Sequence, residues 1–241
     1  QVVRTPAVVS AVQPDRDTYA SAGTASVSLD TATTRRLLGE VPAAFHAGVQ
    51  DILLIAFGLA WTEFLGTGPT PIGIDVEGHG REEQWAADDV DLSRTVGWFT
   101  TKYPIALTPG AITWEQVRAG DAALGAVIKD AKEQLRALPD PVSYGLLRYV
   151  NPDVDLGGAE PGIGFNYLGR LGSGAGEISE ELWRIDADAA TLSAAAAAIA
   201  MPLMHTVALN AGTLDTESGP RLQASWPWAP SAMDAGQIDR L

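Results

Sequence analysis

Helical and strand-like spacings of hydrophobic residues alternate along the chain, which predicts a mixed α and β fold. The clearest helix covers residues 48–65, where apolar side chains recur at steps of three and four until Gly66 ends the pattern. Residues 71–77 follow as a strand that leads into the glycine-rich segment 78–80. The recurring apolar residues of the helix are Val49, Ile52, Leu53, Ala56, Leu59 and Ala60.

The remaining segments show weaker patterns of the same two kinds. The predicted strands lie at residues 25–29, 103–107 and 164–168, and a closing hairpin pairs 203–211 with 221–228. The predicted helices run from Asp30, as a cap, to Leu38 before Gly39 and Pro42, from Thr113 to about Leu138, around 144–149, and onward from a capping box of Ser231 and Asp234.

Two segments lack a regular pattern. Residues 1–23 look irregular and contain Pro6 and Pro14, so we expect a lead-in before one folding unit over residues 24–241. Residues 189–200 are nearly all alanine, which fits either a helix or an ordered loop packed against a partner. The expected fold class is α/β with a mixed, mostly open sheet flanked by helices.

Composition excludes several classes of function. The chain has 241 residues and a formal net charge of −14, without a Lys/Arg cluster, which argues against a nucleic-acid binder. It has no cysteine, and its three histidines are far apart in sequence, so we expect neither a disulfide nor a metal site. The longest apolar run, residues 52–61, is too short to span a membrane, and we expect a cytoplasmic protein.

Residues 75–82, DVEGHGRE, are the first segment with chemical potential. Glu77 stands at a predicted strand end beside glycines, where a carboxylate faces a cleft and the backbone can approach a ligand. His79 lies two positions further on and can share the face of Glu77. A surface turn with a salt bridge to Arg81 explains the same residues equally well.

Two later segments add to this one. Residues 94–104, RTVGWFTTKYP, are aromatic and β-prone, and in isolation they indicate a loop folded over the core through Trp98 and Phe99. Residues 164–170, GFNYLGR, place the hydrogen-bonding groups of Asn166 and Tyr167 on opposite faces of a strand. An ordinary half-buried strand accounts for that segment too.

Taken in this order, EGHGRE, RTVGWFTTKYP and FNYLGR resemble the epimerization domains of nonribosomal peptide synthetases. These domains belong to the condensation-domain superfamily, with a two-lobed fold like chloramphenicol acetyltransferase. The resemblance runs from about residue 15 to the end, and implies the carboxyl-terminal lobe. The family's other motif, His-His-x-x-x-Asp-Gly on the amino-terminal lobe, does not occur in this sequence. Residues 141–145, PVSYG, are less glycine-rich than the family pattern.

The resemblance implies inversion of the α-carbon in an aminoacyl or peptidyl thioester. The substrate is carried on the 4'-phosphopantetheine arm of a peptidyl carrier protein, and no cofactor is bound directly. Glu77 matches the family's acid/base glutamate, and Asn166 and Tyr167 match residues near the thioester. His79, Arg81 and Trp98 are expected to support the site: His79 by a hydrogen bond, Arg81 by pairing with an acidic neighbour, and Trp98 in a loop that meets the other lobe.

Other interpretations stay open. Without the amino-terminal lobe the chain is expected to have little activity alone. It is also compatible with a fragment of a condensation domain, with a dual condensation and epimerization domain, or with a non-catalytic module that docks carrier proteins. His46 and His205 stand in apolar surroundings, which is more typical of core or interface groups.

Overall fold

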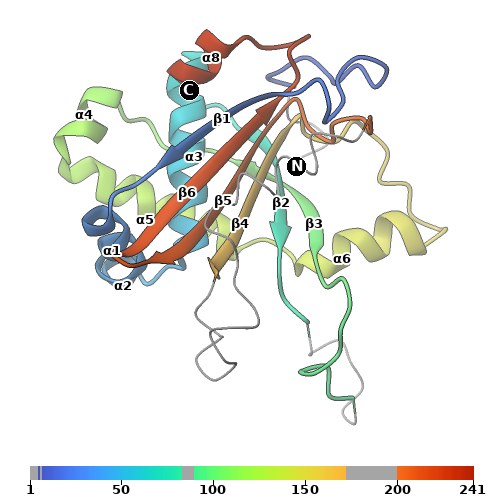
Figure 1. The fold of residues 1–241 in the computed structure, drawn as a ribbon, viewed down its shortest axis with the longest axis horizontal. Helices are drawn as coiled ribbons and strands as arrows, with labels where there is room; N and C mark the ends of the chain where they lie inside the picture. Colours follow the sequence, from blue (N-terminus) through green and yellow to red (C-terminus); the bar gives the residue numbers. More distant parts are fainter. Residues whose placement is uncertain (1–4, 6, 83–89, 172–199) are drawn as a thin grey trace.

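The computed structural model describes residues 5, 7–82, 90–171 and 200–241. Within these ranges, six strands form one mixed sheet in the order β1-β6-β5-β4-β2-β3 (Figure 1). Strands β2, β4 and β5 run parallel, and the other neighbouring pairs are antiparallel. The strands are β1 (Gly23–Ser28), β2 (Ile72–Gly78), β3 (Thr101–Leu107), β4 (Ile163–Leu171), β5 (Val207–Thr216) and β6 (Gly219–Trp228).

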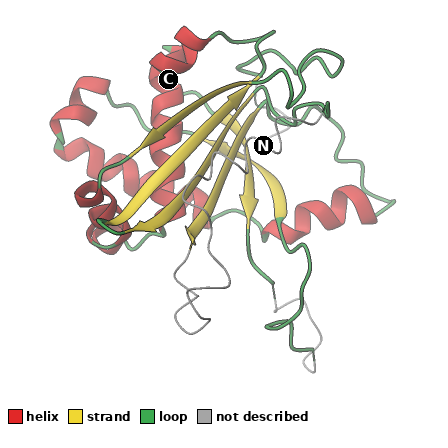
Figure 2. Cartoon of the chain, viewed as in Figure 1, coloured by secondary structure: helices red, strands yellow, loops and turns green. Residues whose placement is uncertain are grey.

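The helices gather mainly on one face of the sheet (Figure 2). The long helix α3 lies along that face, with α1, α2, α4 and α5 beside it, while α6 and η3 lie near the β3 edge (Figure 1). The helices are α1 (Thr31–Leu38), α2 (Glu40–Phe45), α3 (Val49–Leu65), α4 (Trp114–Ala119), α5 (Ala122–Arg136), α6 (Pro141–Gly145), the π-helical turn η3 (Leu146–Val150) and α8 (Ala235–Arg240).

Helix α3 joins the helical layer to the sheet through aromatic side chains. Phe57 packs against Phe165 of β4 and Trp226 of β6, each with ring centroids 5.6 Å apart, and Trp61 is fully buried beside it. Buried aromatic and aliphatic surface of this kind is the main favourable term in folding. The predicted helix is confirmed, and Leu59 of the predicted stripe is buried, whereas Ala56 of the same stripe is exposed.

The predicted end of the first helix at Leu38, before Gly39, is confirmed, but the role of Pro42 and the helix predicted from Thr113 were wrong. Pro42 does not end a helix: it lies in the first turn of α2, where its missing N–H leaves no helical hydrogen bond unmade. The single helix predicted from Thr113 to Leu138 is two helices, α4 and α5. Gly120 ends α4 in the left-handed conformation at φ 64°, and the Asp121 side chain then caps α5.

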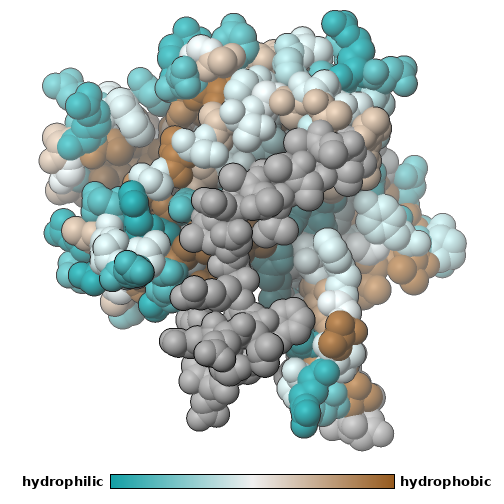
Figure 3. All heavy atoms as spheres, viewed as in Figure 1, coloured by the Kyte–Doolittle hydropathy of each residue, from teal (hydrophilic) through white to brown (hydrophobic). Residues whose placement is uncertain are grey.

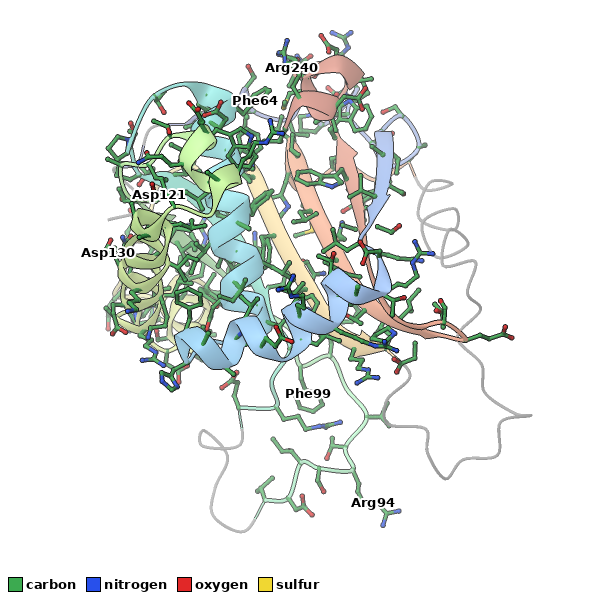
Figure 4. The ribbon with its side chains drawn as sticks, turned by 90° about the vertical axis from the view of Figure 1, so that its left-hand side faces the viewer. Phe64, Arg94, Phe99, Asp121, Asp130 and Arg240 are labelled. Carbon is green, nitrogen blue, oxygen red and sulfur yellow. The ribbon has the colours of Figure 1, made fainter. Side chains whose placement is uncertain are left out.

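The carboxyl-terminal hairpin of β5 and β6 is confirmed, and Asp234 begins α8 with Gln237 in a capping box. Ser231 has a different role from the one predicted, because its hydroxyl donates to buried Asp17 in the amino-terminal segment at 2.6 Å. Arg240 then lies over the ring of Phe64 at the end of α3, 5.9 Å from the centroid (Figure 4). Most of the alanine-rich segment lies outside the described residues.

Within the described residues, no single helix is long and apolar enough to cross a bilayer; only α1–α2 and α3 taken together, bent by 92°, meet the length and composition test.

Candidate functional site

Strand alternation separates the two faces of the sheet. Ile74 and Val76 of β2 and Phe165 of β4 point to the helical layer and are buried there. Asp75 and Glu77 therefore lie on the opposite face. A small pocket opens on that face, lined from β2, β4 and β5 by Asp75, Glu77, Gly164, Asn166, Ala208 and Asn210.

Glu77 and Asn166 meet where β2 and β4 separate. The two strands pair in parallel at only two positions, Asp75 with Gly164 and Val76 with Phe165. The same register places Glu77 next to Asn166, one step beyond the last pair, and both side chains are half-buried in the pocket lining. In open sheets, the carboxyl ends of diverging parallel strands are where ligands bind.

His79 supports Asn166, as its position two residues beyond Glu77 allows. Its Nε2 lies 2.7 Å from Asn166 Oδ1, and its Nδ1 lies 3.3 Å from the hydroxyl of Thr100. The expected structural hydrogen bond of His79 therefore exists, and its partner is itself a candidate site residue.

Asp75 forms the buried side of the site and is only 2% exposed. One of its oxygens accepts hydrogen bonds from His205 Nε2 at 3.0 Å and from Lys102 Nζ at 3.2 Å. Lys102 also donates to Glu160 at 2.6 Å. Burial opposes the charged ammonium, but Glu160 and Asp75 outweigh it and raise the pKa of Lys102 above its ordinary value. The cation offsets the buried Asp75 charge.

Tyr19 brings the amino-terminal segment to the same pocket. Its backbone N–H donates to Met201 O at 3.0 Å, beside the bridge between Thr18 and Pro202. Burial, and then the nearby carboxylate of Glu77, raise the pKa of Tyr19 above its ordinary value of 10.0. The phenol therefore keeps its proton at neutral pH and can act as a donor there.

Tyr167 does not join this group. Alternation turns its side chain to the helical layer, where it is 8% exposed and its hydroxyl lies 3.2 Å from Thr213 Oγ1. The two residues of the FNYLG segment thus face opposite ways, and only Asn166 lies beside Glu77. We therefore correct the grouping of Tyr167 with Glu77 and assign Tyr167 to the packing of β4 on β5.

Arg81 contacts two backbone carbonyls and an aromatic ring within the described residues, whereas the acidic residues at 83, 88 and 89 lie outside them, so its predicted acidic pairing stays a prediction. Its guanidinium donates to the carbonyls of Leu92 and Thr95, both at 2.6 Å, and lies 4.6 Å from the ring centroid of Phe99. These are the contacts of Arg81 within the described residues. They hold together residues 90–100, a segment that extends below the sheet and that we call the extension. Phe99 and Arg94 on this segment are labelled in Figure 4.

Trp98 is 90% exposed on this extension, and Val96 is fully exposed. The alternative in which Trp98 folds over the core is therefore wrong. Figure 3 shows hydrophobic surface on the extension and over α6 and η3. Leu146, Tyr149 and Val150 are exposed in that second region. Exposed apolar surface of this kind is typical of an interface.

The pocket is too small for a complete substrate site. Its volume is about 60 Å³, whereas ligand pockets measure about 300–1,000 Å³. Among the residues described here, no group of three or more His, Asp or Glu is arranged to hold a metal ion. The described residues provide one wall with a carboxylate, a carboxamide and a phenol.

Sequence reasoning missed three members of this wall: Tyr19, Asp75 and His205. The sequence could have indicated Asp75, because it lies two residues before Glu77 in a predicted strand and therefore shares its face. No local pattern indicates His205 or Tyr19 as site residues, because their contacts join segments more than a hundred residues apart in sequence.

Comparison with known proteins identifies relatives of this chain. The family model described as Condensation domain matches residues 6–191. Surfactin synthase subunit 2 of Bacillus subtilis (strain 168) is 43% identical over 141 residues, which cover 58% of this chain and 4% of that protein. Chondramide synthase cmdD of Chondromyces crocatus is 42% identical over 154 residues, covering 63% of this chain and 4% of that protein.

Two solved structures share the fold. The epimerization domain from the third module of tyrocidine synthetase B superposes with a TM-score of 0.67 at 25% identity, covering 98% of this chain and 49% of that one. The X-domain from teicoplanin biosynthesis superposes with a TM-score of 0.55 at 16% identity, covering 97% and 47%. The chain thus spans about half of these solved chains and a small part of the curated relatives. The predicted fold class is confirmed.

Proposed function

The chain belongs to the condensation-domain family, and from that premise we propose that it is the carboxyl-terminal lobe of a peptide synthetase epimerization domain. The reaction is inversion of the α-carbon in an L-aminoacyl or peptidyl thioester on the 4'-phosphopantetheine arm of a peptidyl carrier protein. The observation that carries the proposal is the position of Glu77 beside Asn166 where β2 and β4 diverge. The likeness to a solved epimerization domain over 98% of the chain supports it.

Glu77 is the acid/base residue in this proposal. The α-proton of a thioester is weakly acidic, so a positioned base must remove it as negative charge develops on the thioester oxygen. The Glu77 carboxylate takes that proton, breaking the α C–H bond and leaving an enolate. A second acid on the opposite face returns a proton to the α-carbon, which gives the D-epimer.

Asn166 is the candidate group for the enolate. His79 engages its Oδ1, so the Nδ2 amide is the part of the side chain available to donate to an oxyanion. Tyr19 supplies a further neutral donor in the same pocket. Donors placed in advance stabilise the charge without reorganisation during the reaction.

The amino-terminal lobe of the same domain is the proposed partner, and its histidine motif supplies the second acid/base group. The pocket volume of about 60 Å³ supports a site completed by another surface. Exposed Trp98 and Val96, on the extension below the sheet, are the residues we assign to the contact between lobes.

The test combines the chain, a separately produced amino-terminal lobe and an L-aminoacyl carrier protein in deuterated water. Deuterium at the α-carbon and the D to L ratio of the released amino acid report the reaction. We expect exchange with both lobes and little with this chain alone. Glu77→Gln should lower the rate by about 100-fold or more, since general acid–base catalysis contributes roughly 10²–10⁴. Glu217→Gln, in the exposed turn between β5 and β6, is the matched control.

Three results would contradict the proposal. Full exchange by this chain alone would show that the second lobe is unnecessary. Unchanged exchange in Glu77→Gln would remove its acid/base role. Carrier binding without exchange in any combination would favour a docking module instead.

A condensation or dual condensation and epimerization domain is the second candidate, because the matching family model carries the condensation name. Peptide-bond formation by the reunited lobes, assayed with donor and acceptor carrier proteins, separates it from the first. Condensation without α-proton exchange would favour the pure condensation domain, and both activities together would favour the dual one.

A further inference from the structure

The boundary between β2 and β4 is the shortest strand pairing in the parallel part of the sheet. It has two register pairs, whereas β2 pairs with β3 over seven and β4 with β5 over seven. Glu77 and Asn166 lie on the two sides of this boundary. Few main-chain hydrogen bonds therefore connect the strands that carry the two candidate site residues. Side-chain contacts must also contribute to the spacing of these residues.

His205 connects the two sides beneath the site. It lies just before β5, and its Nε2–H donates to Asp75 Oδ2 of β2 at 3.0 Å, so its ring passes across β4. The β4 residue under the ring is Gly164, where a Cβ atom would stand 2.5 Å from His205 Nδ1. Only glycine leaves room for the ring in this position.

The Asp75 end of this bridge is fixed from the other side. Lys102 of β3 donates to the same Asp75 oxygen, and Glu160 holds Lys102 in turn. Glu160 also pairs with Arg148 at 3.3 Å. The His205 side chain is only 9% exposed, and Asp75 is 2% exposed. Buried, ion-paired hydrogen bonds of this kind have one geometry and resist displacement.

We propose that His205 is a positioning residue that sets the spacing of Glu77 and Asn166 across the β2–β4 boundary. Its ring lies over Gly164 and donates a hydrogen bond to Asp75. Asp75 and Glu77 are two residues apart on one strand face, and Gly164 and Asn166 are two apart on the neighbouring one. A bridge between the first members of each pair therefore fixes the second members. His79 closes the opposite end through Asn166. The inference rests on the proposed function for its catalytic consequence, but its structural content is independent of it.

The first test uses this chain alone and needs no activity. Nuclear magnetic resonance follows backbone amide hydrogen exchange at residues 164–166 and the side-chain amide signals of Asn166. We expect His205→Ala to speed exchange at these amides and to shift the Asn166 side-chain signals. His205→Gln, which retains an N–H donor at the same reach, should restore both. Thr34→Val is the matched control, because it removes the fully buried hydroxyl that accepts from Leu222 N in the helical layer.

Gly164→Ala adds a second approach that leaves the donor and acceptor intact. Its Cβ should displace the ring and reproduce the effects of His205→Ala. In the His205→Ala background the ring is gone, so Gly164→Ala should have a smaller effect, which a double-mutant cycle measures as non-additivity. Additive effects of the two substitutions would contradict the proposed packing of the His205 ring over Gly164.

The second test is α-proton exchange with the reunited lobes. We expect His205→Ala to lower kcat by about tenfold to a hundredfold, the scale of a misplacement of about 1 Å, with KM nearly unchanged and with rescue by His205→Gln. An unchanged kcat, or amide exchange at 164–166 that rises no more than in Thr34→Val, would overturn the positioning role. If the parent lobes exchange no proton, the proposed function fails, and the resonance test still decides the role of His205.

Discussion

His79 Nε2 lies 2.7 Å from Asn166 Oδ1, across the point where β2 and β4 separate. Because a carboxamide oxygen only accepts, His79 must carry its proton on Nε2. Its Nδ1 lies 3.3 Å from the Thr100 hydroxyl oxygen. The histidine of the EGHGR segment therefore sets the orientation of the Asn166 carboxamide and directs its N–H groups away from the loop.

This relationship predicts the effect of His79→Ala. Without the Nε2 donor, the Asn166 carboxamide can rotate. We expect kcat for α-proton exchange by the reunited lobes to fall about tenfold, which is less than the roughly 10²–10³-fold loss on removing an oxyanion donor, because the carboxamide itself remains. Thr100→Val, which removes only the partner of Nδ1, should have a smaller effect. Equal losses in the two variants would show that the loop as a whole, rather than the carboxamide, is responsible.

The contacts of Arg81 predict a local change in the extension. Arg81→Ala removes two carbonyl hydrogen bonds and the stacking on Phe99, so the segment around Arg94 should open more often. We expect faster tryptic cleavage after Arg94, measured by mass spectrometry, with the melting temperature nearly unchanged. Arg36→Ala, an exposed helical substitution, is the control. Cleavage at the parent rate would mean that other contacts hold the segment.

Much of the fold was predictable because its signals are local. Asp30 caps α1 and Gly66 ends α3 as their residue types indicate. The errors arise where a local signal is compatible with two structures. Proline, as at Pro42, suits the first turn of a helix as well as the segment after its end. Gly120 ends α4, and Asp121 immediately after it caps the next helix, α5. Ser231 resembled a cap but bonds Asp17, a contact that spans 214 residues.

The candidate site was predictable to the extent that it follows from strand alternation. The pattern of β2 indicated the face of Glu77 and His79, and the pattern of β4 put Asn166 and Tyr167 on opposite faces. It did not indicate which of those two faces carries the site. That depends on the helical layer, which Phe57 of α3 anchors on Phe165. Packing between distant segments decides such a choice, and a single sequence does not encode it in local spacing.

The exposure of Trp98 predicts that its substitution affects assembly and not folding. Trp98→Ser removes a side chain that is 90% exposed, so the free energy of unfolding should change by less than about 0.5 kcal/mol. If the extension meets the other lobe, binding of the amino-terminal lobe should weaken, as measured by calorimetry. Trp114→Ser, at an exposed position of α4 in the helical layer, is the matched control. Unchanged binding would remove Trp98 from the proposed contact.

The pairing of Ser231 with Asp17 predicts a pH-dependent loss of stability. Burial raises the pKa of Asp17, but hydrogen bonds from the Ser231 hydroxyl and the Gln13 and Ser231 amides outweigh it, leaving the pKa below 3.8. A carboxylate with a lowered pKa in the folded state contributes stability above its unfolded pKa and loses it as pH falls through the folded value. Ser231→Ala should therefore lower the free energy of unfolding by about 1–3 kcal/mol at pH 7.

Urea unfolding at a series of pH values checks this prediction. The difference between the parent and Ser231→Ala should be constant near neutral pH and should shrink as pH falls below 3.8, because protonation of Asp17 removes the charge that the hydroxyl stabilises. Ser28→Ala, at an exposed position, should give no such dependence. A difference that stays the same down to pH 3 would mean that the serine contributes through packing, and that the hydrogen bond to ionised Asp17 does not hold the amino-terminal segment in place.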